Sequence, residues 1–412
     1  MTMLGLMQQL SHTALFDVGS RARHFNRAET AAQLLRLREY LRDFVATLED
    51  AQNTPPVLAT ISPPLWEAAH VAWFAEWWCV RDAYNTADGE TRADRDSVWI
   101  DCDGFLNSNL IAHQARWHLP QLTRAATLDY LDRSLALTLA ALDRADETDA
   151  GLYPFRLSMF HEAMHLEALA WAAQTLAWAQ PAWVLDAPSS GVDRVRSAHQ
   201  GAATNGASAN TEHGARSAPN EVGFNGSGFS FDNERLPHAH TLATLNLSTE
   251  PVSNAAFTRF VESEAYEQAC TKRHPIFWRT SPNGWQQRRF DQWIDLVPDE
   301  PVIHIGAAEA DAYCAWARVR LPTEFEWEAA AADGRIDWGN SVWEWTASNF
   351  APYPGFSADR YREYSAPWFD GKHRVLRGGS HATLDIMHHA SYRNYFLPHR
   401  SDVFAGFRTV AL

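Results

Sequence analysis

The sequence predicts an α+β protein of two domains, a helical first half followed by a mixed second half. Residues 1–186 carry apolar side chains at three- and four-residue spacing over four long stretches, which is typical of amphipathic helices. From residue 223 to residue 412, short strand-like runs alternate with loops rich in Trp, Gly and Pro. A length of 412 residues also fits two domains, at about 100–200 residues per domain.

Four helical patterns account for the first domain. They are RAETAAQLLRLREYLRDFVATLED (27–50), PPLWEAAHVAWFAEWWCVRDAY (63–84), TLDYLDRSLALTLAALDRA (127–145) and LYPFRLSMFHEAMHLEALAWAAQTLAWA (152–179). The second begins with proline, as helices often do, because the first turn leaves its N–H groups unbonded anyway. Four such helices predict a bundle, a fold whose interior commonly holds metal sites.

The next segment, 187–222, is rich in Gly, Ala, Ser and Asn and poor in large apolar residues. We therefore expect a flexible linker or loop without secondary structure. Beyond it, HTLATLNLS (240–248) and RVLRGGS (374–380) predict strands, while SNAAFTRFVESEAY (253–266) and AAEADAYCAWARVR (307–320) predict helices. This mixture predicts an α+β domain with much irregular structure.

Composition limits the possible partners and the compartment. The formal charge of −15 argues against a nucleic-acid-binding protein, which would show a basic surface. The four cysteines are widely spaced and form no CxxC pair, so we expect reduced thiols and a cytoplasmic protein. No signal peptide is recognisable, and the most apolar stretch, 168–185, is interrupted by two glutamines and a proline. We expect no membrane partner.

One helical pattern carries the strongest signal for chemistry. His161 and His165 are four residues apart and share a helix face, and with Glu162 they form an HExxH string. His70, in another apolar helix of the predicted bundle, supplies a third imidazole. HExxH suggests a zinc hydrolase with Glu162 as general base. The three histidines suggest instead a non-haem Fe(II) centre with open coordination positions. Spacing alone does not distinguish iron from zinc.

Longer strings extend the interpretation. RLPTEFEWEAAA (320–331), GNSVWEWTASNF (339–350), RVLRGGS (374–380) and AGFRTV (405–410) resemble the formylglycine-generating-enzyme fold, a C-type-lectin-like domain. PPLWEAAHVAWF and FHEAMHLEA resemble the metal-binding strings of DinB-like four-helix bundles. In this order the two halves resemble the ergothioneine-pathway sulfoxide synthases and the related selenoneine synthases. That resemblance implies an Fe(II)- and O2-dependent enzyme that bonds sulfur or selenium to C2 of hercynine, Nα-trimethylhistidine.

The resemblance also implies residue roles. His70, His161 and His165 would bind Fe(II), and Tyr361 would donate a proton or hydrogen atom, with Tyr364 nearer the ammonium group. A phenol suits this role because it is uncharged at neutral pH. The remaining substrate-binding candidates are Asn394, Tyr395, Met164, Arg116, Phe396 and Arg400.

The donor is inferred from departures from the sulfoxide synthases that use γ-glutamylcysteine. Those enzymes clamp the donor carboxylate with two arginines, whereas this chain has Arg116 and then Leu119. Met164 replaces a glutamine and Phe396 replaces an acidic residue. The chain thus resembles the selenoneine synthases, which implies 1-seleno-β-D-glucose as donor. Candidate contacts for such a sugar are Asn107, Asn109, His113, Gln114 and Trp117.

The leading prediction is therefore oxidative C–Se bond formation with selenoneine as the product type. The alternative is the sulfoxide-synthase reaction with γ-glutamylcysteine or cysteine. Two further classes stay open, the zinc hydrolase and a non-catalytic ligand-binding protein with a lectin-like domain. A thiol-oxidising formylglycine-generating enzyme is disfavoured, because that chemistry needs late cysteines and none follows Cys314.

Overall fold

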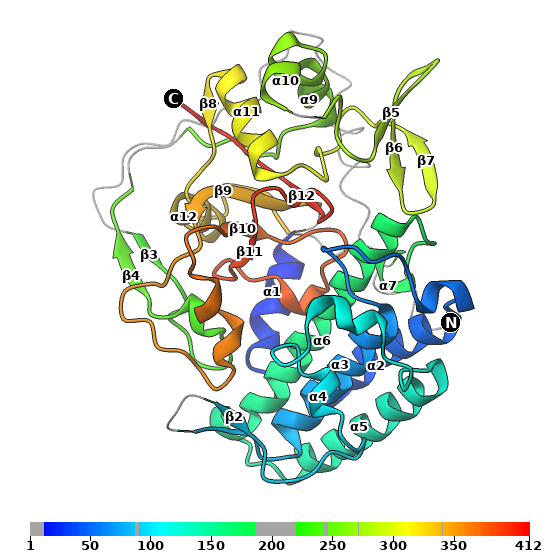
Figure 1. The fold of residues 1–412 in the computed structure, drawn as a ribbon. Coiled ribbons are helices and arrows are strands. Elements are labelled where there is room, and N and C mark those ends of the chain that lie inside the picture. Colours follow the sequence, from blue (N-terminus) through cyan, green and yellow to red (C-terminus); the bar gives the residue numbers. More distant parts are fainter. Residues whose placement is uncertain (1–11, 87–89, 186–219, 243–245, 271, 340) are drawn as a thin grey trace, which may run out of the picture. The chain divides into compact units, whose positions relative to one another are not determined.

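The computed structural model describes residues 12–86, 90–185, 220–242, 246–270, 272–339 and 341–412. These residues form two compact units (Figure 1). One contains 19–185 together with 227–229, and the other contains 230–412 together with 220–226 and the described residues before 19. The mixture of helices and sheets confirms the predicted α+β class. The predicted division into a domain at 1–186 and a domain at 223–412 stays a prediction.

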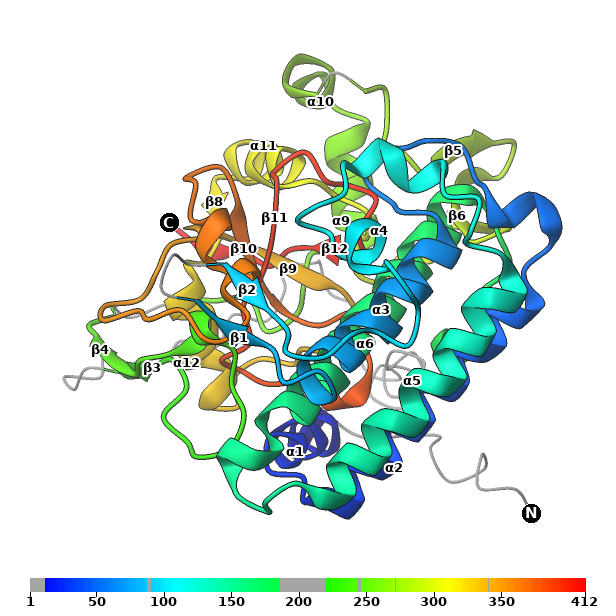
Figure 2. The same ribbon diagram turned by 60° about the horizontal axis from the view of Figure 1, so that its bottom comes forward.

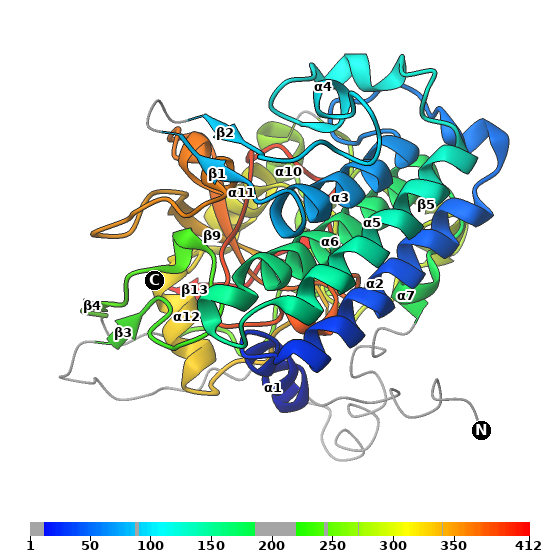
Figure 3. The same cartoon turned by 90° about the horizontal axis from the view of Figure 1, so that it is seen from below.

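Long helices dominate the first unit. They are α2 (Arg27–Thr47), α3 (Pro64–Cys79), α5 (Arg124–Arg144) and α6 (Asp149–Leu176), with the short helices and turns η2 (Asp50–Asn53), α4 (Asp103–Leu106), η3 (His113–Trp117) and α7 (Ala182–Leu185) around them. Helix α1 (His12–Ala22) precedes them, and its residues up to 18 are counted with the other unit. The helices α2, α3, α5 and α6 run alongside one another (Figures 2 and 3), and α3 packs on both α5 and α6. A short hairpin, β1 (Tyr84–Asn85) with β2 (Thr91–Arg92), follows α3.

Helix α3 is the most enclosed element of this unit. All of its residues are buried, which explains why its sequence is apolar on every side. The neighbouring helices α2, α5 and α6 each begin at a side-chain N-cap. Asn26 and Glu29 form a reciprocal capping box at the start of α2, and Thr123 and Thr148 accept backbone N–H groups at the starts of α5 and α6. These caps and the burial of α3 confirm the four helical patterns expected from the sequence.

The second unit is built on short strands. Its main sheet has the order β11-β10-β9-β12, from β9 (Trp343–Asn349), β10 (Arg374–Gly378), β11 (Asn394–Phe396) and β12 (Ala405–Gly406). A three-stranded meander contains β5 (Trp278–Ser281), β6 (Gly284–Arg289) and β7 (Gln292–Asp295), and two-stranded sheets join β3 (Asn220–Val222) to β4 (His238–His240) and β8 (Val319–Arg320) to β13 (Val410–Ala411). The helices are α9 (Asn254–Val261), α10 (Glu264–Ala269), α11 (Ala307–Ala317) and α12 (Glu324–Ala332), with the single turns η4 (Asp232–Glu234), η5 (Arg362–Tyr364), η6 (Ala366–Trp368) and η7 (Asp385–Met387).

Three details differ from the sequence expectation. The last residues of the predicted linker, 220–222, form β3, because their backbone pairs with β4. The remaining linker residues, 187–219, lie outside the described part of the chain. The predicted strand 240–248 contributes His240 to β4 and a bridge from Leu247 to Val410. The helix predicted at 253–266 is divided in two, since α9 ends at Val261 and α10 begins after Ser263.

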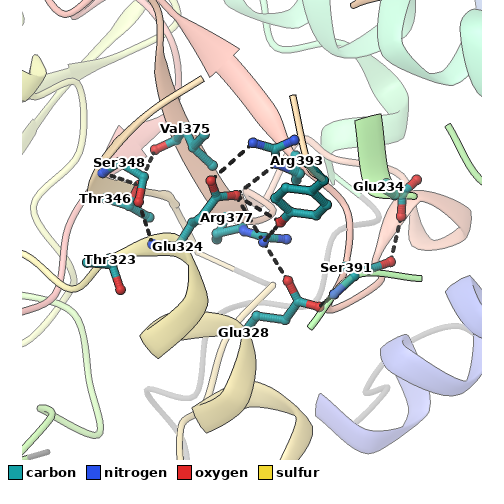
Figure 4. Close-up of polar contacts among 12 residues, drawn as sticks. Glu234, Thr323, Glu324, Glu328, Thr346, Ser348, Val375, Arg377, Ser391 and Arg393 are labelled. Carbon is teal, nitrogen blue, oxygen red and sulfur yellow. Dashed lines mark hydrogen bonds and ion pairs between the residues drawn. The ribbon is translucent and has the colours of Figure 1, made fainter. Parts of the chain in front are cut away.

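A buried ion-pair network supports the main sheet (Figure 4). Glu324, at the start of α12, accepts hydrogen bonds from Arg393 at 2.7 and 3.0 Å, from Arg377 at 3.2 Å and from the Tyr353 hydroxyl at 3.1 Å. Arg377 on β10 also donates to Glu328 at 2.6 Å. Both guanidinium groups then donate to backbone carbonyls, Arg377 to those of 390 and 392 and Arg393 to those of 233 and 351. The network therefore fixes the backbone on either side of residue 391, just before β11.

The four cysteines are free, and burial, the largest influence on each, raises the pKa of every thiol. The pKa is about 12 for Cys79, Cys102 and Cys314 and about 11 for Cys270. In the described segments, no helix combines the length and the apolar character that crossing a membrane requires.

Replacing Glu324 with alanine should destabilise the protein strongly, because two fully buried guanidinium groups then lose their shared carboxylate. We expect a loss of about 3–5 kcal/mol in the free energy of unfolding, measured by urea denaturation. The control is Asp311→Ala. Asp311 is the half-exposed partner of Arg374, which lies on β10 as Arg377 does, and its loss should lower the free energy of unfolding by at most about 1 kcal/mol. Equal losses in the two variants would show that the network contributes no more than a surface pair.

Candidate metal centre

The three histidines singled out in the sequence lie together in the first unit. His70 comes from α3, and His161 and His165 come from successive turns of α6. One ring nitrogen from each lies within 4.8 Å of the other two. His70 and His161 are buried, while His165 is partly exposed. The packing of α3 on α6 thus assembles the cluster that the sequence could only suggest.

The outer ring nitrogens of two histidines are held by hydrogen bonds. His70 Nδ1 lies 2.8 Å from the backbone carbonyl of Leu106, and His165 Nδ1 lies 2.5 Å from Oε1 of Glu67. Both partners are acceptors, so each Nδ1 carries the proton and each Nε2 presents a lone pair. A ligating histidine typically has such an acceptor on its other nitrogen.

The inner nitrogens suit a divalent cation. Nε2 of His165 lies 3.0 Å from Nε2 of His161, which is the separation expected of adjacent ligands that are each about 2.1 Å from one ion. Burial lowers the pKa of His70 to about 3 and lowers that of His161 well below its usual value. Both rings are therefore neutral at pH 7 and able to donate lone pairs. The residues fit a three-histidine metal site.

The HExxH glutamate faces a different part of the bundle. Glu162 is buried, and its two carboxylate oxygens accept from Arg38 on α2 at 2.8 and 3.1 Å. Arg38 also donates to Ser134 and to the Leu131 carbonyl on α5. A carboxylate held in this way is not placed to activate water, so the geometry disfavours the zinc-hydrolase interpretation with Glu162 as general base.

Arg116 lies beside the histidine cluster. Its guanidinium stacks 3.9 Å above the Trp66 ring, and Trp66 in turn stacks on His70 with ring centroids 4.9 Å apart. One of its nitrogens donates to Ser62 at 3.1 Å, while its buried Nε has no hydrogen-bond partner among the described residues. Met164, between the two histidines of α6, is half-buried. Of the two predicted substrate contacts in this unit, Arg116 is linked to the cluster through Trp66. Met164 is adjacent to His165 on α6.

The segment around α4 is fixed by partly buried polar contacts. Asp103 accepts from both terminal nitrogens of Arg81, at 2.6 and 2.8 Å, and from the Trp73 indole at 2.7 Å. The Phe105 carbonyl accepts from the Trp66 indole at 2.7 Å. These contacts hold the single turn α4 in place, and the carbonyl at its end is the one that His70 binds.

Several residues of the predicted sugar-contact set have partners within the chain. Trp117 is buried in an apolar cluster with Ile61 and Ala172, and its indole donates to the Pro55 carbonyl, so it is a core residue. His113 is held at 2.8 Å from the Ile61 carbonyl. The side-chain oxygen of Asn107 accepts from the backbone of Asn109. Gln114 is exposed. Contact of these residues with a sugar stays a prediction.

The predicted tyrosines lie in the second unit, in an aromatic cluster. The Tyr364 hydroxyl is 3.2 Å from that of Tyr392, its ring stacks on Phe231, and Tyr361 lies 6.0 Å away between ring centroids. The Tyr395 hydroxyl donates to the Tyr364 carbonyl. Burial is the main cause that raises the pKa of Tyr361, Tyr364 and Tyr395, so these phenols keep their protons at neutral pH.

The other candidates of this unit have mixed outcomes. Asn394 and Tyr395 begin β11 beside the buried network, and Tyr395 stacks on Phe350. Arg400 does not present a free guanidinium, because it binds both oxygens of Asp402, at 2.6 and 2.7 Å, and lies over the Phe396 ring. Arg400 therefore takes part in an intramolecular ion pair, and its role as a substrate contact stays a prediction.

Sequence reasoning missed Glu67, Trp66 and the Leu106 carbonyl. Glu67 lies three residues before His70, a spacing that places both on one helix face, so the sequence held a usable signal for it. Trp66 is adjacent to it but looks like any other apolar residue of α3. The Leu106 carbonyl is a backbone group and leaves no sequence signal.

The chain matches a known protein family. A model described as the sulfatase-modifying factor enzyme 1-like domain matches residues 201–341 and 334–411, more than half of the chain. The chain belongs to this family. This match agrees with the resemblance noted for the second half of the sequence. The DinB-like fold of the first half stays a prediction.

Individual relatives of this sulfatase-modifying factor enzyme 1-like protein extend the likeness into the first unit. The hercynine oxygenase of Mycolicibacterium smegmatis is 29% identical across 92% of this chain and 98% of its own length. That of Mycolicibacterium thermoresistibile is 29% identical across 93% and 94%. That of Mycobacterium tuberculosis is 33% identical across 43% of this chain and 55% of its own. All three names refer to hercynine and none to selenium, so they favour the sulfoxide-synthase alternative over the selenosugar prediction.

Replacing His70 with alanine should abolish tight binding of a divalent cation, because one of three neutral nitrogen donors is lost. We expect the purified variant to lose stoichiometric Fe(II) binding, measured anaerobically by chelator competition. His113→Ala is the control, since His113 lies in the same unit and contacts the Ile61 carbonyl. Full iron occupancy in His70→Ala would rule out the three-histidine site.

Proposed function

We propose that this protein is an iron- and O2-dependent oxidoreductase that bonds a sulfur donor to C2 of hercynine, as an ergothioneine-type sulfoxide synthase does. The observation that carries the proposal is the buried cluster of His70, His161 and His165 with its inner nitrogens directed at one another. The likeness to hercynine oxygenases over nearly the whole chain supports the substrate. A cytoplasmic location goes with it, since the chain's own thiols are free.

The reaction balances with one O2. A C–S bond forms at hercynine C2 as the C–H and S–H bonds break, and the sulfur is then oxidised to a sulfoxide. One oxygen atom enters the sulfoxide and the other leaves as water with the two hydrogens. Carbon and sulfur together lose four electrons, which reduce O2.

Within this proposal the three histidines hold Fe(II). When bound, the ferrous ion would supply the redox-active centre and the open positions that activation of O2 requires. The chain's contribution is to keep the imidazoles of His70 and His161 neutral by burial and to fix those of His70 and His165 through acceptors on their outer nitrogens. Both effects favour cation binding over protonation at neutral pH.

The aromatic residues of the second unit are proposed to serve hercynine and its protons. Tyr361 is the proton or hydrogen donor, a role that its raised pKa supports because the phenol stays protonated. Tyr364, Asn394 and Tyr395 are proposed contacts of hercynine. A trimethylammonium group is bound best by aromatic faces, which this cluster offers.

Arg116 is proposed to bind the carboxylate of the donor. Its Nε is buried with no hydrogen-bond partner in the described segments, so a bound carboxylate would relieve an unsatisfied group. Because Leu119 replaces a second arginine, the site offers one guanidinium. We therefore propose cysteine as the better sulfur donor and γ-glutamylcysteine as the poorer one.

A second candidate is 1-seleno-β-D-glucose, with C–Se bond formation. The observation that favours it is the same partial clamp: a neutral sugar requires no arginine pair, and Met164 and Phe396 make their surroundings apolar. Selenols ionise more readily than thiols, whose pKa is about 8.5, so a selenolate would be present at neutral pH.

A donor competition tests both candidates. Protein, Fe(II), air and hercynine are mixed with cysteine, γ-glutamylcysteine and the selenosugar at equal concentration, and products are measured by mass spectrometry alongside O2 uptake. We expect the cysteine adduct to exceed the γ-glutamylcysteine adduct at least tenfold. A dominant selenosugar product would establish the second candidate, and no hercynine-dependent O2 uptake would refute both.

Replacing Tyr361 with phenylalanine should lower the rate of product formation by about 10²-fold or more, with little change in the KM for hercynine, because a proton donor is lost while the ring stays. Tyr364→Phe should instead raise that KM. Steady-state kinetics by mass spectrometry separates the two effects. Tyr313→Phe, in a different aromatic cluster of the same unit, should leave both constants unchanged. Wild-type rates in Tyr361→Phe would exclude it as the donor.

A further inference from the structure

Glu67 makes the shortest contact to the histidine cluster. It lies one turn before His70 on α3 and is 8% exposed. Its Oε1 is 2.5 Å from His165 Nδ1, although the two residues are 98 positions apart and lie on different helices. The packing of α3 against α6 therefore places the Glu67 carboxylate beside Nδ1 of His165, one of the three predicted metal ligands.

The histidines differ in what their outer nitrogens contact. His70 Nδ1 meets the neutral carbonyl of Leu106, whereas His165 Nδ1 meets a carboxylate. A charge-assisted hydrogen bond is roughly twice as strong as a neutral one, so it fixes the ring and its tautomer more firmly. It also makes the opposite nitrogen more electron-rich. His165 is thereby the histidine whose lone pair is best prepared for a cation.

Glu67 also bears on the charge of the centre. Three neutral imidazoles offer a divalent cation no compensating charge. A buried carboxylate in contact with one of them supplies a negative charge just outside the coordination shell. The electrostatic attraction between this carboxylate and a cation is weakly screened, because the group is buried.

We propose that Glu67 is a positioning residue of the metal centre: through His165 it fixes the Nδ1–H tautomer, directs Nε2 at the cation and provides the negative charge that the three histidines lack. This inference rests on the proposed metal site and adds to it a fourth residue that does not touch the ion. It predicts that the carboxylate charge matters for metal affinity apart from turnover.

The test compares Glu67→Gln, which keeps the size and a hydrogen-bond acceptor but removes the charge, with Glu67→Asp, which keeps the charge on a shorter side chain. Affinity for Fe(II) and Co(II) is measured anaerobically by chelator competition, and the visible Co(II) spectrum reports ligand geometry. We expect Glu67→Gln to weaken binding 10–100-fold and Glu67→Asp to weaken it less. Glu309→Gln, a buried Glu-to-Gln change in the other unit, should bind within twofold of the wild type.

Wild-type affinity in Glu67→Gln would overturn the inference, and equal losses in Glu67→Gln and Glu309→Gln would do so as well. A wild-type protein that binds neither cation would instead refute the proposed metal site itself. A further measurement does not depend on the folding of any Glu67 variant. With ¹⁵N-labelled histidine in the wild-type protein, the His165 resonance, assigned by its loss in His165→Ala, should show the proton on Nδ1; a proton on Nε2 would contradict the role of Glu67.

Discussion

The ion pair between Arg38 and Glu162 determines how α6 is rotated within its bundle. Successive helix residues differ by about 100° around the axis, so fixing Glu162 toward α2 and α5 directs His161 and His165 to another side. That side is the one on which α3 packs. An unpaired charge at either position would be costly in such a buried place. The arrangement of the histidines therefore depends on a contact that does not involve them.

The second unit uses the same principle on a larger scale. Glu324 joins two buried arginines, and these hold carbonyls of segments far apart in the sequence. Regular sheet structure is sparse there, with strands of two to seven residues. Where the strands are short and leave backbone carbonyls unpaired, buried arginine side chains donate hydrogen bonds to some of them. The placement of Asn394 and Tyr395 at the start of β11 follows from this network.

The sequence predicted best what depends on local periodicity. The four helices and the pairing of His161 with His165 follow from spacing, and the burial of α3 explains why His70 joins them. Contacts between distant positions could not be predicted. The sequence places Glu67 near His70 on one helix, but it does not show that Glu67 contacts His165 on α6. The ion pair of Arg400 with Asp402 was likewise not predicted from the sequence. The HExxH string suggested Glu162 as a general base, but Glu162 forms a buried ion pair with Arg38. Donor identity was least predictable, because it depends on single substitutions such as Leu119 whose surroundings the sequence does not give.

The burial of Cys79, Cys102 and Cys314 has a consequence for the proposed O2-dependent activity. A thiol with a pKa near 12 is ionised to about one part in 10⁵ at pH 7, whereas an exposed one with a pKa of about 8.5 is ionised to a few per cent. The thiolate is the form that oxidants attack. Cys79 on α3 and Cys102 beside the Asp103 loop belong to the same unit as the histidine cluster, yet both are held as neutral thiols. Under the proposed activity, the fold would thus protect these two thiols from oxidation, and an external thiol would be the more vulnerable partner for an oxidant.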